Sequence, residues 1–197
     1  MSNLCVEVIE TGVVEDDYEA TRSVLMRAAE EADAIVSTGG VSVGEEDHVK
    51  AAVESLGGLD VWKLAIKPGK PFASGKVCGK QFFGLPGNPV SAFVTFVLLV
   101  RPALLSMQGT SRVFPGWLDV PVGFAMARSG ERQEYLRVCL QEDGDGNALL
   151  ERFDNQSSGV GVSLSLADGL AVVPPQTAVS VGDKLKFLSL IHISEPT

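Results

Sequence analysis

Short apolar runs and amphipathic stretches alternate along the first half of the chain. Apolar residues that recur every three or four positions predict helices, and short apolar runs that end at glycine or proline predict strands. The predicted helices are residues 17–31, 47–56 and 89–107, the last reset at Pro102, and the predicted strands are residues 4–9, 34–37, 61–66, 72–74 and 81–83. This alternation indicates an α/β domain of three layers, with helices on both faces of a mostly parallel sheet.

The pattern changes after Gly109 to short strands separated by glycine-containing turns. The predicted strands are residues 117–122, 134–141, 148–153, 170–173 and 184–188. They indicate a small all-β domain, either a barrel or a sandwich. We therefore expect an α/β domain over residues 1–110 and a β domain over residues 111–190. The first domain is expected to begin in mid-fold, because its opening strand lacks a preceding βα unit, and residues 191–197 fit no element and are expected to be a non-native tail.

Composition narrows the class of protein. The chain has 197 residues, of which 45% are hydrophobic and 21% charged, and its net charge of −9 argues against a general nucleic-acid binder. The longest uncharged apolar run, residues 89–100, predicts a buried helix and no membrane partner. The three cysteines are isolated and there are only two histidines, so we expect a reducing, cytoplasmic compartment and no structural zinc.

The turn at residues 84–91 is the first candidate site. It joins a predicted strand to a predicted helix, for which Asn88 is a capping residue and Pro89 suits the first position. Backbone N–H groups and the helix dipole would then meet at one point, which favours a bound anion.

A glycine-rich stretch at residues 38–47 is the second candidate site. Gly39 and Gly40 would let backbone approach a phosphate or a flat ring closely. Asp47 could hold Mg²⁺ that faces substrate phosphates, or could simply favour the start of the next helix, and Asp16 could add a metal ligand or a general base, or belong to a solvated helix start.

Lysines supply the third candidate site. Residues 50–80 contain six lysines against two acids, and Lys63, Lys67 and Lys70 lie on or beside a loop stiffened by two prolines. They could contact a phosphate or oxyanion, or could form an ordinary solvated face. In the β domain, Arg137 could face a ligand or pair with Glu134 or Glu151, and the hydroxyls of residues 156–159 could reach an oxyanion or belong to a plain turn. The two histidines, His48 and His192, suggest no nucleophilic triad.

Three motifs occur in order: residues 37–47, 62–72 and 84–91. Together they resemble the molybdopterin molybdenumtransferase family, which includes the E domain of gephyrin. The β domain fits the same family through residues 133–137 and 155–159, and the resemblance runs over residues 4–188. It implies that adenylylated molybdopterin is bound with Mg²⁺, that molybdate is inserted at the dithiolene sulfurs and that AMP leaves. It also implies a homodimer for the full-length protein.

The resemblance also assigns roles to residues. Asp16 and Asp47 would serve Mg²⁺ and the hydrolysis of the adenylyl bond, and Lys63, Lys67 and Lys70 would neutralise phosphate and molybdate. The residues expected to bind the pterin nucleotide and the oxyanion are Thr38, Gly39, Gly40, Ser42, Gly44, Lys70, Pro71, Pro86, Gly87, Asn88, Pro89, Ser91, Arg137 and Ser158.

Only the C-terminal portion of the family is represented, so we expect that the fragment could lack activity by itself. Two other functions remain open. One is a scaffold or pterin-binding module without catalysis, and the other is a molybdopterin adenylyltransferase. The transferase would release AMP on addition of molybdate, the adenylyltransferase would consume ATP, and a scaffold would do neither.

Overall fold

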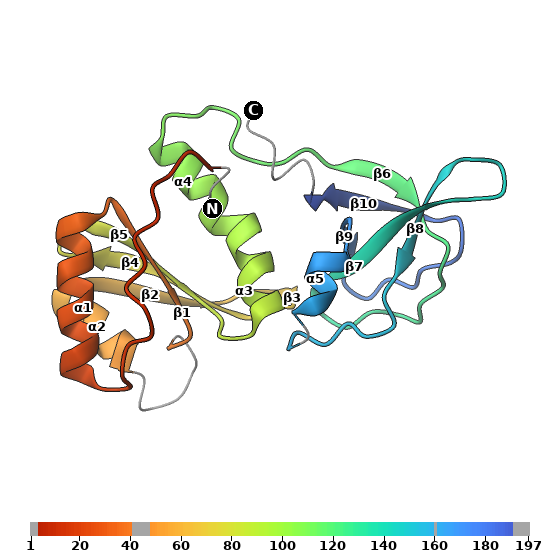
Figure 1. Cartoon of the computed structure of the whole chain (residues 1–197). Coiled ribbons are helices and arrows are strands. Elements are labelled where there is room, and N and C mark those ends of the chain that lie inside the picture. Colours follow the sequence, from red (N-terminus) through yellow and green to blue (C-terminus); the bar gives the residue numbers. More distant parts are fainter. Residues whose placement is uncertain (1–3, 41–47, 160, 191–197) are drawn as a thin grey trace. The chain divides into compact units, whose positions relative to one another are not determined.

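Figure 1 shows the computed structural model, which describes residues 4–40, 48–159 and 161–190. The contacts divide the chain into two compact units. The first, here called the α/β unit, contains Met1–Leu64 and Gly69–Gly109, and the second, the β unit, contains Ala65–Pro68 and Thr110–Thr197. Residues 65–68, which the sequence places in the first domain, thus belong by their contacts to the second unit.

The α/β unit has a four-stranded sheet between two layers of helices. One hydrophobic cluster joins helices α1 (Tyr18–Glu31) and α2 (His48–Leu56) to one face of the sheet through Ile35 and Phe82. Another joins the last helices of the unit to the opposite face through Phe83 and Leu85. The three layers and the α/β class are therefore confirmed. The elements are α1 (Tyr18–Glu31), β1 (Ala34–Thr38), α2 (His48–Leu56), β2 (Gly57–Lys63), β4 (Pro71–Val77), β5 (Lys80–Leu85), α3 (Pro89–Thr95), the π-helix η2 (Phe96–Val100) and α4 (Arg101–Met107).

The sheet is mixed, and the expectation of a mostly parallel sheet is wrong. Its order is β1-β5-β4-β2, in which only β1 and β5 are parallel, whereas β4 is antiparallel to both of its neighbours. The reason lies in the turn between β4 and β5, where Cys78 and Gly79 have φ of 49° and 84°. Two successive residues with positive φ make a tight hairpin, whereas a parallel crossover needs a dozen or more residues.

The strand expected at residues 4–9 does not form. None of the described strands pairs with this segment, and Val8 and Ile9 are each 48% exposed. A strand exists only where a neighbour accepts its hydrogen bonds, and β1, the nearest edge of the sheet in sequence, pairs only with β5. The segment is instead held through Gln108, whose side-chain amide donates to the Leu4 carbonyl at 2.8 Å.

The apolar helix predicted at residues 89–107 is continuous, and the predicted reset at Pro102 is confirmed. Just before the proline, η2 replaces the α-helical pattern, and the Arg101 N–H donates to the Phe96 carbonyl five residues back. Proline cannot complete the normal helical bond, and the π turn absorbs the irregularity. Of the described helices, this 19-residue stretch is the one long and apolar enough to cross a membrane; half of it is buried within the protein, as expected for a core helix.

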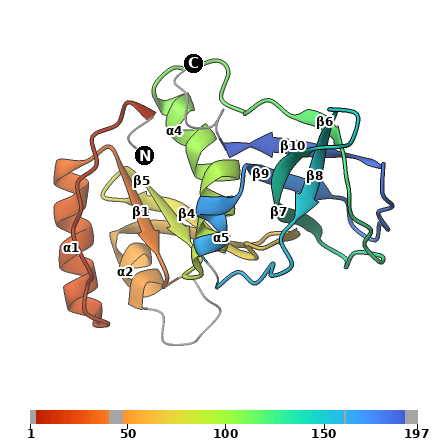
Figure 2. The ribbon, with the colours of Figure 1, turned by 45° about the vertical axis from the view of Figure 1, so that its right-hand side comes forward.

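The described residues of the β unit form one sheet and one short helix, as the topology shows (Figure 2). Its strand order is β3-β7-β9-β10-β6, with β8 paired to β7, and the described strands do not close into a barrel. The buried side of the sheet includes Val122, Leu136, Leu150 and Phe187. The elements are β3 (Ile66–Lys67), β6 (Leu118–Pro121), β7 (Gln133–Glu142), β8 (Ala148–Arg152), α5 (Val162–Leu166), β9 (Gly169–Val173) and β10 (Lys184–Ser189).

Candidate functional site

Three strands of the α/β unit end at the same edge of the sheet, here called the rim. β1 and β5 are parallel, and β2 runs in the same direction because both β2 and β5 are antiparallel to β4. The rim therefore holds the ends of β1, β5 and β2 and the start of β4, with Thr38 paired to Leu85 and Lys63 paired to Pro71. Three strand spacings of about 4.8 Å span the sheet, so the rim is about 14 Å wide.

Two of the predicted loops touch at the rim. The Gly39 N–H donates to the Leu85 carbonyl at 3.0 Å, which links the glycine loop (residues 38–40) to the proline turn (residues 84–91). Gly39 and Gly40 have φ of 85° and 66°, in the left-handed region that favours glycine. A methyl group placed on Gly87 would lie 3.7 Å from the Cα of Gly39. The structure thus brings the first and second candidate sites together at this edge of the sheet.

The proline turn leads into α3 as the sequence predicts. Asn88 is the N-cap residue, Pro89 occupies the first turn, and the Ala92 N–H donates to the Asn88 carbonyl at 2.8 Å. The Asn88 side chain makes no capping hydrogen bond and is exposed, so it remains available to a ligand. Pro86 is buried against the sheet and Ser91 is buried in the first turn of the helix.

A cavity of about 470 Å³ opens beside the glycine loop. Asp16 lines it together with Thr38, Gly39 and Gly40, and α1 and β1 form its apolar wall. The neighbouring Asp17 has a structural role, because it caps α1 by accepting from the Ala20 N–H at 2.8 Å. The cavity therefore brings one predicted carboxylate and the glycine loop to a shared space.

Of the two predicted magnesium ligands, Asp16 is described and Asp47 lies outside the described residues, as do Ser42 and Gly44 of the predicted pterin-nucleotide site. Within residues 4–40, 48–159 and 161–190 no group of three histidine, cysteine or acidic residues could hold a metal ion. Glu15 and Asp16 both line the cavity. That donor set fits Mg²⁺, which commonly takes one or two carboxylates and completes its shell with water and substrate phosphate oxygens.

Two of the predicted lysines belong to the α/β unit. Lys63 ends β2 at the rim, Lys70 precedes β4, and both side chains are exposed. The Leu64 N–H donates to the Lys70 carbonyl at 2.7 Å, which closes the lysine loop (residues 63–71) at its base. Neither lysine forms an ion pair with a described residue, so both positive charges face solvent.

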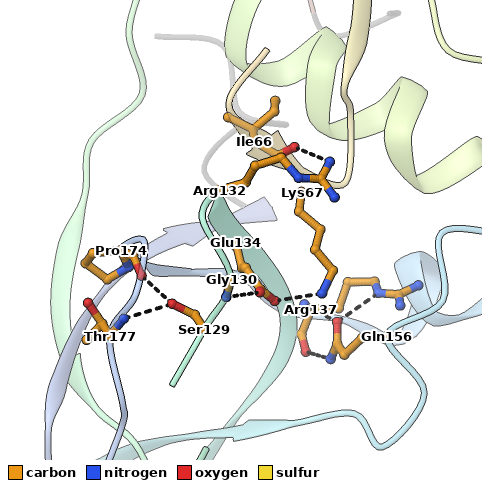
Figure 3. A network of polar contacts seen from close by, with 10 residues as sticks. All are labelled: Ile66, Lys67, Ser129, Gly130, Arg132, Glu134, Arg137, Gln156, Pro174 and Thr177. Atoms are coloured by element: carbon orange, nitrogen blue, oxygen red, sulfur yellow. Dashed lines mark hydrogen bonds and ion pairs between the residues drawn. The ribbon is translucent and has the colours of Figure 1, made fainter. Parts of the chain in front are cut away.

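The third lysine, Lys67, belongs to the β unit. In β3 it pairs in parallel with Glu134 of β7, and its Nζ lies 3.2 Å from the Glu134 Oε2 (Figure 3). Glu134 is 8% exposed and also accepts from the Gly130 N–H at 3.4 Å. The side chain of Arg132, just before β7, donates to the carbonyl of Ile66 in β3 at 3.2 Å. Sequence reasoning missed this role of Glu134, although a charged residue beside the buried Tyr135 and Leu136 is a signal that could have revealed it.

Arg137 holds a loop of the β unit. It is 1% exposed, and burial lowers the pKa of its guanidinium. Its side chain donates to the carbonyls of Asn155 and Ser157 at 3.0 and 3.2 Å and to the Ser163 hydroxyl. Its Nε reaches the side-chain oxygen of Gln156 at 3.4 Å (Figure 3). The structure thus pairs Arg137 with neither Glu134 nor Glu151, and Ser158 follows directly on a residue that Arg137 holds.

Comparison with known proteins gives matches over both units. A family model described as "Probable molybdopterin binding domain" matches residues 1–106, and one described as "MoeA C-terminal region (domain IV)" matches residues 119–190. A molybdopterin molybdenumtransferase of Haemophilus influenzae is 48% identical over 72% of this chain and 34% of its own length. One from Nostoc is 31% identical over 93% of this chain and 44% of its own.

Solved structures agree with the sequence matches. Two structures of the molybdopterin biosynthesis protein MoeA of Pyrococcus horikoshii have TM-scores of 0.70 and 0.67, with 29% and 25% identity. They cover 90% and 92% of this chain, which in turn covers 42% and 41% of theirs. The chain spans less than half the length of these relatives. By the matches to both units, it belongs to the molybdopterin molybdenumtransferase family of molybdenum cofactor biosynthesis.

Proposed function

We propose that this chain serves the insertion of molybdate into adenylylated molybdopterin with release of AMP. The observation that carries the proposal is the gathering of the glycine loop, the proline turn and two lysines at one rim of the α/β unit. Ligands of α/β sheets bind beyond the carboxyl ends of parallel strands, and backbone N–H groups and cations at such an edge suit phosphates and oxyanions. The names of the relatives support the transfer of molybdenum to molybdopterin.

In this proposal each part of the rim has a separate task. The left-handed backbone of Gly39 and Gly40 admits a flat or phosphorylated group without steric hindrance from a side chain. Lys63 and Lys70 neutralise phosphate and molybdate charge, which stabilises charge that develops as the adenylyl bond breaks. Lys67, in the β unit, is the third lysine to which the family resemblance assigns this task.

Magnesium would be held by Asp16, with Asp47 as the second predicted ligand. When bound, it would supply Lewis-acid stabilisation of the phosphoryl oxygens. The exposed carboxylate of Asp16 at the wall of the cavity supports this assignment. Arg137 and Ser158 remain proposed contacts of the oxyanion. We also propose that the full-length protein is a homodimer and that it is located in the cytoplasm.

The test is product analysis with the purified chain, adenylylated molybdopterin, Mg²⁺ and molybdate. We expect AMP release that depends on molybdate, and at least a tenfold loss of rate in Lys70→Ala, since an electrostatic contact in the transition state is commonly worth 10²–10³. Lys76→Ala is the matched control, because Lys76 is an exposed lysine near the opposite end of β4.

A parallel assay with molybdopterin and ATP separates the other functions. Consumption of ATP there, without AMP release from the adenylylated pterin in the first assay, would indicate an adenylyltransferase, and binding of the pterin without either reaction would indicate a scaffold. Equal rates in Lys70→Ala and Lys76→Ala would show that the rim is not the reaction site.

A further inference from the structure

The ion pair between Lys67 and Glu134 is unequal in its exposure to water. The Lys67 side chain is 55% exposed, whereas that of Glu134 is 11% exposed. The parallel register of β3 and β7 sets the two residues side by side on one face of the sheet, so the pair is held by the backbone as well as by the side chains. The Gln133 N–H also donates to the Ala65 carbonyl at 3.0 Å, which secures the strand from its other end.

Glu134 has a fixed place in the β unit. It accepts from the Gly130 N–H (Figure 3). The neighbouring Ser129 is fixed by two hydrogen bonds: the Ser129 hydroxyl donates to the Pro174 carbonyl at 2.7 Å and accepts from the Thr177 N–H at 3.0 Å. A carboxylate this far from water needs a cation and an N–H donor to offset its desolvation. Glu134 therefore anchors the lysine and is not free to follow it.

An ammonium group has three N–H donors, and Glu134 takes one of those of Lys67. The other two belong to a side chain that is more than half exposed. A free lysine loses much of its rotamer freedom when it binds an anion, whereas an anchored one has already lost it. The anchored ammonium is thus prepared to bind an oxygen of an anionic ligand.

We propose that Glu134 is a positioning residue that holds the Lys67 ammonium in place for an oxygen of the anionic substrate. This inference rests on the proposed function for the identity of that substrate. The anchoring of Lys67 by Glu134 is independent of the proposed function and can be measured without any ligand.

Two substitutions separate reach from charge. Glu134→Asp keeps the negative charge but withdraws the carboxylate by about 1.5 Å, beyond hydrogen-bond distance from the observed position of Nζ. Glu134→Gln removes the charge but keeps an oxygen at the same reach. Positioning predicts that Glu134→Asp is the more harmful change. A role in charge balance predicts the reverse.

The first measurement is NMR of the lysine ammonium groups in the ¹⁵N-labelled chain. We expect the Lys67 Nζ signal to show restricted motion in the wild type and in Glu134→Gln, and to lose that restriction in Glu134→Asp. Lys186 is the internal reference, because it pairs with Asp119 at 2.7 Å but both side chains are more than half exposed. Asp119→Asn is the matched control, and it should leave the Lys67 signal unchanged.

The second measurement is titration with inorganic molybdate. We expect Glu134→Asp to weaken binding on the order of fivefold, Asp119→Asn to have no effect, and Glu134→Asp to add nothing in a Lys67→Ala background. Thermal unfolding of each variant identifies any that do not fold. If Glu134→Asp does not fold, the ammonium signals are compared between the wild type and Glu134→Gln alone. A mobile Lys67 ammonium in Glu134→Gln would then overturn the proposal.

The two proposals fail in different ways. An unrestricted Lys67 in the wild type, or a Glu134→Asp effect that persists without Lys67, overturns the positioning role. A wild-type chain that binds no molybdate overturns the proposed function for this chain, and the ammonium signals then decide alone whether Glu134 anchors Lys67.

Discussion

The candidate residues of the α/β unit and those of the β unit differ in how much of their bonding capacity the fold uses. At the rim, Lys63, Lys70 and Asn88 are exposed, and the fold draws mainly on their backbone groups. In the β unit, Arg137 is 1% exposed and binds one loop through several donors. The comparison teaches that burial with hydrogen-bonded donors identifies a polar residue of a family motif that supports the fold, whatever contact with a ligand it also makes.

The largest effect on stability should come from substitution of Arg137, here called the buried clamp because its guanidinium holds residues 155–157. Arg137→Ala would leave the carbonyls of Asn155 and Ser157 without donors, so we expect a loss of about 3 kcal/mol in the free energy of unfolding. Chemical denaturation measures it. The control is Arg128→Ala, because Arg128 makes similar bonds to Gln176 but is exposed and should cost about 0.5 kcal/mol. Equal losses would remove the distinction between the clamp and an ordinary surface arginine.

The next effect contrasts two glycines of the α/β unit. A methyl group on Gly75 would lie 2.0 Å from the Gly58 carbonyl oxygen on the neighbouring strand, whereas one on Gly39 would meet nothing within 4 Å. Gly75→Ala should therefore cost about 2 kcal/mol of folding free energy through strand displacement, and Gly39→Ala about 1 kcal/mol through its positive φ alone. Thermal unfolding ranks the two, and a larger loss at Gly39 would mean that the rim supports the fold more than the sheet does.

A smaller effect is expected at the other buried arginine. Arg101 is 8% exposed, its Nε has no hydrogen-bond partner among the described residues, and burial lowers the pKa of its guanidinium. Replacing a buried charge that lacks good partners by an apolar residue is commonly neutral or stabilising. Arg101→Leu should thus leave the free energy of unfolding unchanged or raise it by about 1 kcal/mol. A clear loss in the same denaturation assay would reveal a partner outside the described residues.

The smallest effect concerns Asp143 in the exposed hairpin of the β unit. Hydrogen bonds from the backbone and then the side chain of Asn147 hold the pKa of its carboxyl below the ordinary value. Because the folded pKa is depressed, this contribution is present above the unfolded pKa and disappears as the pH falls through the folded one. NMR titration of the Asp143 carboxyl group should give a higher pKa in Asn147→Ala than in the wild type. An unchanged pKa would assign the lowering to the backbone donors alone.

Local features were the most predictable from the sequence. The proline turn places Asn88 and Pro89 as expected because capping and the first helical turn depend on neighbouring residues. The sheet was mispredicted because its direction depends on whether strands joined by Cys78 and Gly79 pair with each other, which the apolar pattern of each strand does not reveal. Residues 4–9 have an apolar pattern typical of a strand but no described partner strand.

What the sequence determined by itself was the family, the glycine and proline motifs and the helices of the α/β unit, since these depend on residue type and short-range spacing. Tertiary structure alone decided that Lys67 pairs with Glu134 and that Arg137 holds a loop through its guanidinium. The physical reason is that pairing across 67 residues, as between Lys67 and Glu134, depends on strand register and burial, which no local pattern of side chains encodes.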